Sequence, residues 1–347
     1  MKKIIYNILI VMALLLFGCT EKVIEKHTKT TSDTLFINFQ NKYQTFFPPS
    51  IKDKTSSQII TQLYLGLVKY NSKNLKIEQG IAKNWKKDTS GTVYTFHLNM
   101  NVYFNENPVF NNQSERVTMK DILFTFQYLC TRLPGNKNFF SLMYKIKGAQ
   151  DYYHSHSEIS DKFDIDGIKA VNDSTLQITT EDKDFPLLDV LALPFASIFS
   201  EKAYKKLKED CYVGAGPYFL KQPPGKEEKT LLLTYNPYYF KQDKNGEYLP
   251  YMSNISISFI RSRNQEMAML KKGELDIVFG LTNNELLRFL EQNIDDIESK
   301  HPKFIVSMPK GNNNISFQHI VSTRIKGFYS NSLSYIDLSV VYTANKE

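Results

Sequence analysis

The side chains best spaced for chemistry in this 347-residue sequence are two histidines, His154 and His156, which flank Ser155. Two imidazoles at this spacing can reach one metal ion, but a metal site needs further cysteine or carboxylate ligands at a recognisable spacing. The surrounding polar segment supplies none in such a pattern, so an exposed turn is the favoured interpretation. His97 lies in an alternating polar and apolar run, which is typical of a structural histidine on a strand.

The sequence carries none of the short motifs that mark nucleophilic or phosphate chemistry. It contains no Gly-x-Ser-x-Gly turn, no Gly-x-x-x-x-Gly-Lys loop and no His-Glu-x-x-His helix. The glycines Gly214 and Gly216 run directly into Pro217 and lack the third glycine of a dinucleotide loop, so a tight turn explains them. We therefore predict no catalytic residue, no metal, no cofactor and no enzymatic activity.

One cysteine is placed for covalent modification. Two lysines precede an uncharged run over residues 4–16, which has the charged start and short apolar centre of a secretory signal and is too short to span a membrane. Cys19 follows Gly18 directly after this run. The arrangement resembles a bacterial lipobox, in which the cysteine thiol is diacylated and becomes the new N-terminus. An uncleaved apolar tail with a chance cysteine is the alternative.

Two acyl chains would make Cys19 a membrane anchor. Burial of each methylene contributes roughly 0.8 kcal/mol, and two chains together hold a protein stably at a bilayer. Residues 1–18 are therefore expected to be a lipoprotein signal peptide. Residues 19–32 are polar and charged without a periodic apolar face, so they are expected to form a flexible lipidated leash. The expected location is the cell envelope, with the chain attached to a membrane through its lipid.

The composition is that of a folded protein. Hydrophobic residues make up 42% and aromatic residues 13% of the chain, which is enough to bury large cores. The net charge of +7 is spread among 36 acidic residues without a block of Lys and Arg, which argues against nucleic acid as a partner. Cys130 and Cys211 would be able to form a disulfide outside the cytoplasm, and two buried free thiols are the favoured alternative.

Strands and helices alternate after the leash, which predicts an α/β protein with mixed sheets. Ser56 and Ser57 are expected to cap the first helix, Thr118 and Asp121 to begin another, and Gly273 to end a third. The expected strands lie at 34–39, 93–98, on both sides of a turn within 168–179, and at 218–220, 230–235, 255–260, 276–279, 304–307 and 338–342; the expected helices lie at 56–70, from 118 to 129, and at 264–272.

Nine short segments carry a resemblance to known proteins. In order, they are Leu63–Tyr70, Ile81–Trp85, Tyr94–Leu98, Val117–Ile122, Gly167–Asp173, Val213–Tyr218, Tyr235–Phe240, Leu249–Tyr251 and Lys272–Ile277. Together they resemble the bacterial extracellular solute-binding proteins of family 5, which serve peptide and nickel ABC importers. The resemblance covers roughly residues 34 to 281 and resumes near the end of the sequence.

The resemblance implies a type II periplasmic binding protein-like fold, in which two lobes close around a ligand like a hinge. It implies a peptide ligand, with nickel, haem or another small solute as alternatives. It also implies an ABC permease as partner, because the transporter recognises the closed form of the binding protein. The residues implied to face the ligand are Lys52, Asp53, Lys54, Phe139, Phe279, Gly280, Leu281 and Thr282.

Each of these implied positions has a structural alternative. Lys52 and Lys54 suit a ligand carboxylate and Asp53 suits an amine, whereas the alternative is a solvated charged loop. Phe139 is alternatively a core residue. Gly280 would let another backbone approach closely, or it marks only the end of a strand.

The chain departs from the family pattern at one point. In the family, a third domain precedes the segment that closes the first lobe, but here residues 304–307 resemble the strand that leads into that domain and residues 316–328 already resemble the closing segment. Most of the second ligand-clamping lobe is therefore expected to be absent. Half a cleft would bind ligand weakly unless a partner completes it, and a non-binding scaffold or decaying remnant is the alternative function. The expected division is 33–64 and 189–308 for lobe I, 65–188 for an additional domain of that lobe, 309–315 for the junction and 316–347 for the closing segment.

Overall fold

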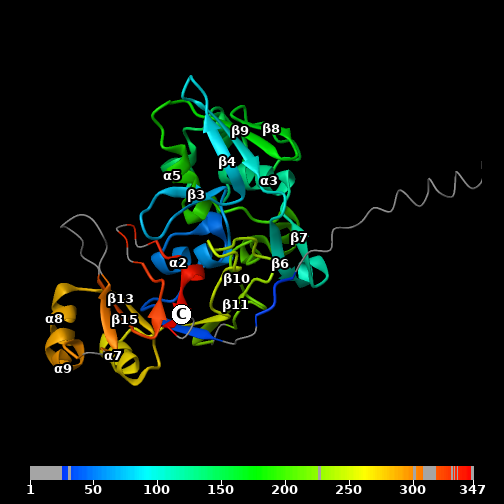
Figure 1. Cartoon of the computed structure of the whole chain (residues 1–347). Coiled ribbons are helices and arrows are strands. Elements are labelled where there is room, and N and C mark those ends of the chain that lie inside the picture. Colours follow the sequence, from blue (N-terminus) through cyan, green and yellow to red (C-terminus); the bar gives the residue numbers. More distant parts are fainter. Residues whose placement is uncertain are drawn as a thin grey trace, which may run out of the picture.

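The structure is a computed structural model that describes most of the chain (Figure 1). It describes residues 26–29, 33–225, 228–299, 302–307, 318–329, 331, 333 and 335–344. The expected signal peptide, the expected anchor Cys19 and the junction 309–315 lie outside the described residues. Among the described residues, no helix has both the length and the apolar character needed to cross a membrane.

A seven-stranded mixed sheet forms the lower half of the molecule as drawn in Figure 1. Its strand order is β10-β11-β12-β1-β13-β15-β14. The central strand β1 runs parallel to both neighbours, with Thr34 opposite Asn254 and Ile37 opposite Ile277. The strands are β1 (Thr34–Asn38), β10 (Tyr218–Phe219), β11 (Thr230–Tyr235), β12 (Asn254–Ser258), β13 (Ile277–Leu281), β14 (Phe304–Ser307) and β15 (Gln318–Ser322).

A four-stranded antiparallel sheet of order β4-β5-β9-β8 forms the upper half. Its strands all come from residues 65–188, and helix α3 lies beside it. The helix begins as predicted, because the Thr118 amide donates to Asp121 Oδ2 at 3.0 Å. The remaining strands are β2 (Val68–Tyr70), β3 (Ile77–Gln79), β4 (Ala82–Lys87), β5 (Val93–Leu98), β6 (Tyr103–Asn107), β7 (Gln113–Arg116), β8 (Ile168–Asn172), β9 (Thr175–Thr179), β16 (Ile325–Lys326) and β17 (Tyr342–Thr343).

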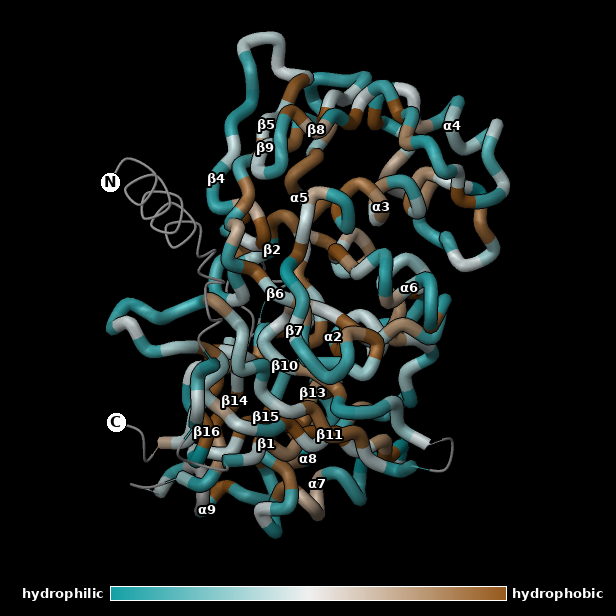
Figure 2. The backbone as a smooth tube through the Cα atoms, turned by 90° about the vertical axis from the view of Figure 1, so that its right-hand side faces the viewer, coloured by the Kyte–Doolittle hydropathy of each residue, from teal (hydrophilic) through white to brown (hydrophobic). Residues whose placement is uncertain are grey.

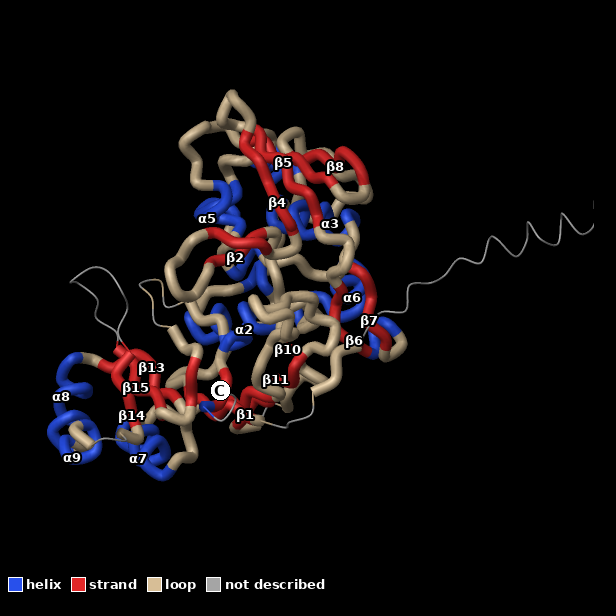
Figure 3. The backbone as a smooth tube through the Cα atoms, in the orientation of Figure 1, coloured by secondary structure: helices blue, strands red, loops and turns tan. Residues whose placement is uncertain are grey.

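Helices surround the two sheets, and α7, α8 and α9 gather beside β13–β15 at one end of the larger sheet (Figure 3). The α-helices are α2 (Lys54–Leu63), α3 (Met119–Cys130), α4 (Ala149–Ser155), α5 (Leu187–Leu191), α6 (Glu201–Leu207), α7 (Arg263–Lys272), α8 (Asn283–Gln292) and α9 (Ile294–Ile297). The short helices are η1 (Pro48–Ser50), η2 (Pro108–Phe110), the π-helical η3 (Phe139–Met143), η4 (Pro194–Ala196), η5 (Lys208–Asp210) and η6 (Leu338–Val340).

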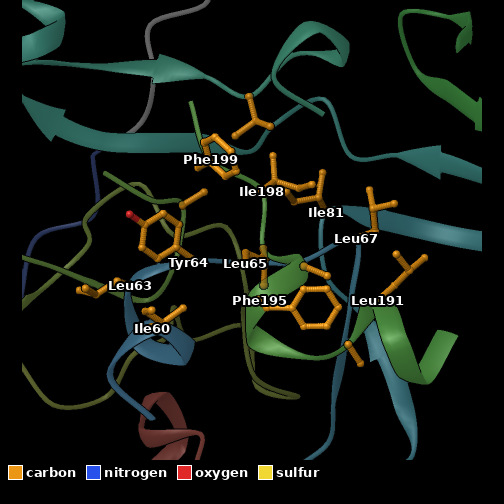
Figure 4. Packing of buried hydrophobic residues seen from close by; sticks show 14 of the residues in the cluster. Ile60, Leu63, Tyr64, Leu65, Leu67, Ile81, Leu191, Phe195, Ile198 and Phe199 are labelled. Carbon is orange, nitrogen blue, oxygen red and sulfur yellow. The ribbon is translucent and has the colours of Figure 1, made fainter. Parts of the chain in front are cut away.

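One large hydrophobic core joins the two halves, and α2 lies between them (Figures 1 and 2). Burying one such aliphatic or aromatic side chain contributes about 1.5–3 kcal/mol. A smaller core joins α7 and α8 to strands β13–β15 through residues such as Leu281 and Phe289. Figure 4 shows the packing around α2 by Ile60, Leu63, Tyr64, Leu65, Leu67, Ile81, Leu191, Phe195, Ile198 and Phe199.

The first predicted helix is shorter than expected and is capped by a different residue. Helix α2 ends at Leu63, because Gly66 packs against Gly80 so closely that the Ile81 amide donates to the Gly66 carbonyl at 2.9 Å. Its cap is Asp53, whose Oδ1 accepts from the Ser56 amide at 2.8 Å. The prediction that Ser56 and Ser57 cap this helix was wrong.

The C-terminal segment also differs from the prediction. Residues 338–342 do not form one strand, since Leu338–Val340 is a short helical turn and only Tyr342–Thr343 pairs, with β16. The turn forms because the Asp337 side chain accepts from the Ser339 amide at 3.0 Å.

Strands β14 and β15 are antiparallel neighbours, with Ser307 opposite His319. Only residues 308–317 separate them in sequence, whereas a domain needs at least about 50 residues. The structure therefore confirms an α/β protein with mixed sheets and a truncated second lobe. Within the described part of the sheet β14 is an edge strand, and its Ile305 is 46% exposed.

The structure also describes the two cysteines after the leash and part of the leash itself. Cys130 and Cys211 are both free and buried, and burial raises the pKa of their thiols to about 12 and about 11. Part of the expected leash, residues 26–29, lies against the folded body: the His27 amide donates to the Pro237 carbonyl at 3.0 Å.

Candidate functional site

The carboxyl ends of β1, β12 and β13 meet at one edge of the seven-stranded sheet, which we call the carboxyl edge. Ligands of open α/β sheets bind in the crevice outside such ends, because the loops that follow the strands converge there. His319 reaches the same edge from the beginning of antiparallel β15, since its neighbour Gln318 lies opposite Leu281. The carboxyl edge is therefore the place to look for a ligand site.

An aromatic cluster lies at this edge. The Phe279 ring lies 5.5 Å from the Phe39 ring, 5.9 Å from the Phe328 ring and 5.7 Å from the His319 ring, all measured between centroids. Gly280, next to Phe279, has φ +64°, a left-handed conformation that favours glycine. The structure thus brings two of the predicted residues, Phe279 and Gly280, together with side chains from β15 and from the segments that follow β1 and β16.

The other two predicted residues of this segment have structural roles. The Leu281 side chain is fully buried in the smaller core. Thr282 caps α8 in a reciprocal capping box with Glu285: the Thr282 amide donates to Glu285 Oε2 at 2.8 Å, and the Glu285 amide donates to Thr282 Oγ1 at 3.3 Å. These contacts account for both side chains without a ligand.

His319, which sequence reasoning did not single out, holds the segment in place. Its Nδ1 accepts a hydrogen bond from the Gly280 amide at 3.2 Å. Burial and, secondarily, the charge of Lys54 lower the pKa of His319 to about 4. The imidazole is therefore neutral near pH 7, with Nδ1 free of a proton and able to accept.

We expect the free energy of unfolding to fall as the pH drops from 6.5 toward 4. The folded-state pKa of His319 lies below the ordinary value of 6.5, so its contribution is complete above that value and is lost as the pH falls through about 4. The loss should be about 3 kcal/mol, measured by urea unfolding across this range. A His319→Gln variant keeps an acceptor without titrating and should show a flatter profile; an unchanged profile would contradict the assignment.

The three predicted residues around the start of α2, Lys52, Asp53 and Lys54, have different roles. Asp53 caps the helix, and its second oxygen, Oδ2, is buried without a hydrogen-bond partner among the described residues. Lys54, the first residue of α2, retains contact with solvent, while partial burial lowers its pKa. Its charge acts on His319, so Lys54 belongs with the aromatic cluster. Lys52, which precedes Asp53 in the sequence, is exposed.

A groove of about 760 Å³ opens beside the carboxyl edge, a volume in the range of small-ligand sites. Tyr43 connects the two, because its ring lies 4.3 Å from that of Phe46 in the groove and 5.5 Å from that of Phe259 after β12. Side chains of both charges line the groove, namely two lysines and two acidic residues. Its lining includes Tyr43, Phe46, Lys52, Lys137, Glu209, Asp210, Tyr212, Pro223 and Pro224.

Phe139 does not line this groove. It is 2% exposed and stacks on Tyr153 at a centroid distance of 4.0 Å, so the structure places it in the core. Its neighbour Asn138 donates to the Pro49 carbonyl at 3.0 Å and thereby ties this segment to the loop before Lys52.

The two histidines of the first motif lie away from this edge. His156 stacks on Tyr152 at 4.0 Å, and His154 is exposed on α4. Across the described ranges, no three His, Cys, Asp or Glu side chains gather in a way that would hold a metal ion.

Arg263 at the start of α7 braces the segment that carries Phe279 and Gly280. Its Nη1 and Nη2 donate to the carbonyls of Phe279 and Gly280, each at 3.2 Å. The same guanidinium pairs with Glu266 at 2.5 Å and with Glu285 at 3.1 Å. Burial raises the pKa of Glu266, and this rise is opposed by the Asn38 amide and the Arg263 charge.

Comparisons with known proteins agree with this architecture. Residues 76–320 match the family model described as bacterial extracellular solute-binding proteins, family 5, middle. The oligopeptide-binding protein OppA of Bacillus subtilis is 25% identical over 250 residues, which are 70% of this chain and 42% of that protein. The heme-binding protein A of Haemophilus influenzae is 27% identical over 206 residues, 56% of this chain and 36% of that protein.

Solved structures establish the fold. A periplasmic oligopeptide-binding protein of Borrelia burgdorferi superposes with a TM-score of 0.64 at 20% identity, covering 80% of this chain and 51% of that chain. The chain thus spans about half the length of the proteins that it matches.

Proposed function

Because this chain belongs to family 5 of the bacterial extracellular solute-binding proteins, we propose that it is the solute-binding component of an ABC importer and that it captures peptides for transport. The observation that carries the proposal is the carboxyl edge, where Lys54, Phe279, Gly280 and His319 converge beside an open groove. An extended peptide offers backbone groups for hydrogen bonds and side chains for roomy pockets. Haem, nickel or another small solute is the alternative ligand.

The charges at the site suit a peptide. Lys52, Lys54 and Lys137 supply cations for a terminal carboxylate, and Glu209 and Asp210 supply anions for an amine. Aromatic rings at Tyr43 and Phe279 offer contact area that tolerates different side chains. Such a mixture favours broad specificity.

The proposal places the protein in the cell envelope. Cys19 is diacylated, becomes the new N-terminus on removal of residues 1–18 and attaches the chain to a membrane, where an ABC permease is its partner. Anchoring raises the effective concentration of the binding protein near its importer.

A second candidate function is a surface lipoprotein that does not bind solute, acting as a scaffold or persisting as a remnant. It is favoured by the direct pairing of β14 with β15, where the family would place a third domain. Without a second lobe the cleft cannot close around a ligand, so affinity falls unless a partner protein completes the cleft.

Thermal-shift measurements with pools of short peptides test the proposal. A ligand present at about 100 times its Kd stabilises the native state by about 2.7 kcal/mol, so the Tm should rise by several degrees. Lys54→Met should reduce the rise, whereas Lys83→Met on β4 of the other sheet should not. Failure of every peptide pool, and of haem and nickel, to shift the Tm would contradict solute binding and favour the scaffold.

A further inference from the structure

The segment Lys26–Lys29 packs against the folded body and forms part of the lining of a second groove, of about 740 Å³, away from the candidate site. This groove lies at the amino-end edge of the large sheet, because Asp33 directly precedes β1 and Met252 lies just before β12. In Figure 1 the dark-blue chain that leads into β1 follows the right-hand side of the molecule toward β6. The docked segment therefore approaches β1 from the end opposite the carboxyl edge.

Three successive kinds of contact hold the segment. The Lys26 ammonium pairs with Glu106 Oε1 at 2.9 Å, and the same oxygen accepts from the Tyr238 hydroxyl at 2.5 Å. The His27 ring stacks on Tyr248 at a centroid distance of 3.3 Å. Its backbone amide donates to Pro237.

Lys29 completes the set of contacts. Its Nζ donates to the Tyr251 carbonyl at 2.5 Å and lies 5.8 Å from the Tyr235 ring centroid. The Lys26 ammonium likewise lies 5.9 Å from the Tyr238 ring. Two lysine side chains of the segment thus lie over tyrosine rings, and one of them also pairs with an acidic residue. Contacts of this kind depend on the side chains present, so the docking is specific to this segment.

We propose that residues 26–29 are a strap that fixes where the N-terminal anchor leaves the body, and so which face of the protein lies toward the membrane. The orientation part of this proposal rests on the lipid attachment proposed above; the docking part does not. Seven residue steps separate Cys19 from Lys26, and at about 3.5 Å per step they span at most about 25 Å. The strap face therefore stays within that distance of the bilayer, while α8, at the far end of the large sheet in Figure 1, lies farther away.

Docking is tested by trypsin digestion of the full chain, with cleavage after Lys26 and Lys29 followed by mass spectrometry. We expect both bonds to be protected, and the double variant Glu106→Gln, Tyr248→Ala to be cleaved at least about tenfold faster, because cleavage follows the undocked population. Tyr329→Ala, which removes an exposed tyrosine outside the groove, is the matched control and should leave the rate unchanged. Cleavage of the wild type as fast as a synthetic peptide of residues 20–33 would overturn the strap.

Orientation is tested on the full chain in vesicles that contain an acceptor-labelled lipid. A donor dye at Lys244→Cys, in the hairpin next to Tyr248, should transfer energy more efficiently than one at Asn284→Cys on α8. The Glu106→Gln, Tyr248→Ala changes should remove the difference. Equal transfer from both positions in the otherwise unchanged chain would overturn the orientation. If mass spectrometry finds no acyl chains, the proposed anchoring fails, and the trypsin result still decides whether the strap is docked.

Discussion

Replacing Arg263 by alanine is expected to lower the free energy of unfolding by about 3–5 kcal/mol and to abolish the stabilisation by ligand. Glu266 is 1% exposed, so the change would leave its carboxylate buried without a cationic partner. The carbonyls of Phe279 and Gly280 would lose their donors, and the segment that faces the proposed ligand would lose its brace. Urea unfolding measures the first effect and thermal shift with peptides the second.

A double variant separates these effects. Arg263→Leu together with Glu266→Leu removes both charges, and such apolar replacements of a buried ion pair are often neutral for stability. We expect it to recover most of the lost free energy but not the ligand response, because no donor returns to the Phe279 and Gly280 carbonyls. If the double variant binds as tightly as the wild type, the brace has no part in binding.

Local sequence patterns predicted most of the fold because the signals are short-range. The alternating run at 230–235 is β11, and Gly273 ends α7 in a left-handed conformation with φ +75°. The helix predicted over 56–70 failed because its second half is determined by Gly66, whose neighbour Gly80 lies on a different turn of the chain. A contact of that kind leaves no periodic signal in the segment itself.

The candidate site was predictable only in outline. Two of the residues implied by family resemblance, Asp53 and Thr282, are helix caps. For Thr282 this role was predictable from the sequence, since Thr282 and Glu285 have the spacing of a capping box. Asp53 likewise lies three residues before Ser56, and its side chain accepts a hydrogen bond from the Ser56 amide. His319 carried no such signal: it is one polar residue in a strand, and its role depends on Gly280, which pairing of β13 with β15 brings near.

Replacing Lys69 by methionine is expected to lower the free energy of unfolding by about 3–5 kcal/mol. The Lys69 ammonium on β2 pairs with the Asp337 carboxylate and lies 3.4 Å from Glu78. Asp337 in turn accepts from the Ser339 amide and hydroxyl, so this pair fastens the C-terminal turn to the upper half of the molecule. Without Lys69 the buried Asp337 carboxylate loses its ion-pair partner and keeps only the more distant charge of Lys241, and urea unfolding at pH 7 should register the loss.

The pH dependence distinguishes loss of this ion pair from a general packing defect. Burial alone would raise the pKa of Asp337, but Lys69 outweighs it and lowers the pKa to about 2. Because this value lies below the ordinary 3.8, the stabilisation is complete above pH 3.8 and is lost as the pH falls through about 2. The difference in unfolding free energy between wild type and Lys69→Met should therefore shrink as the pH is lowered below 3.8. Lys69→Met combined with Asp337→Leu should regain most of the loss at pH 7, since the buried Asp337 carboxylate is removed and the remaining Lys241 ammonium still pairs with Glu78. A difference that stays constant with pH, or a double variant no more stable than the single one, would assign the effect to packing.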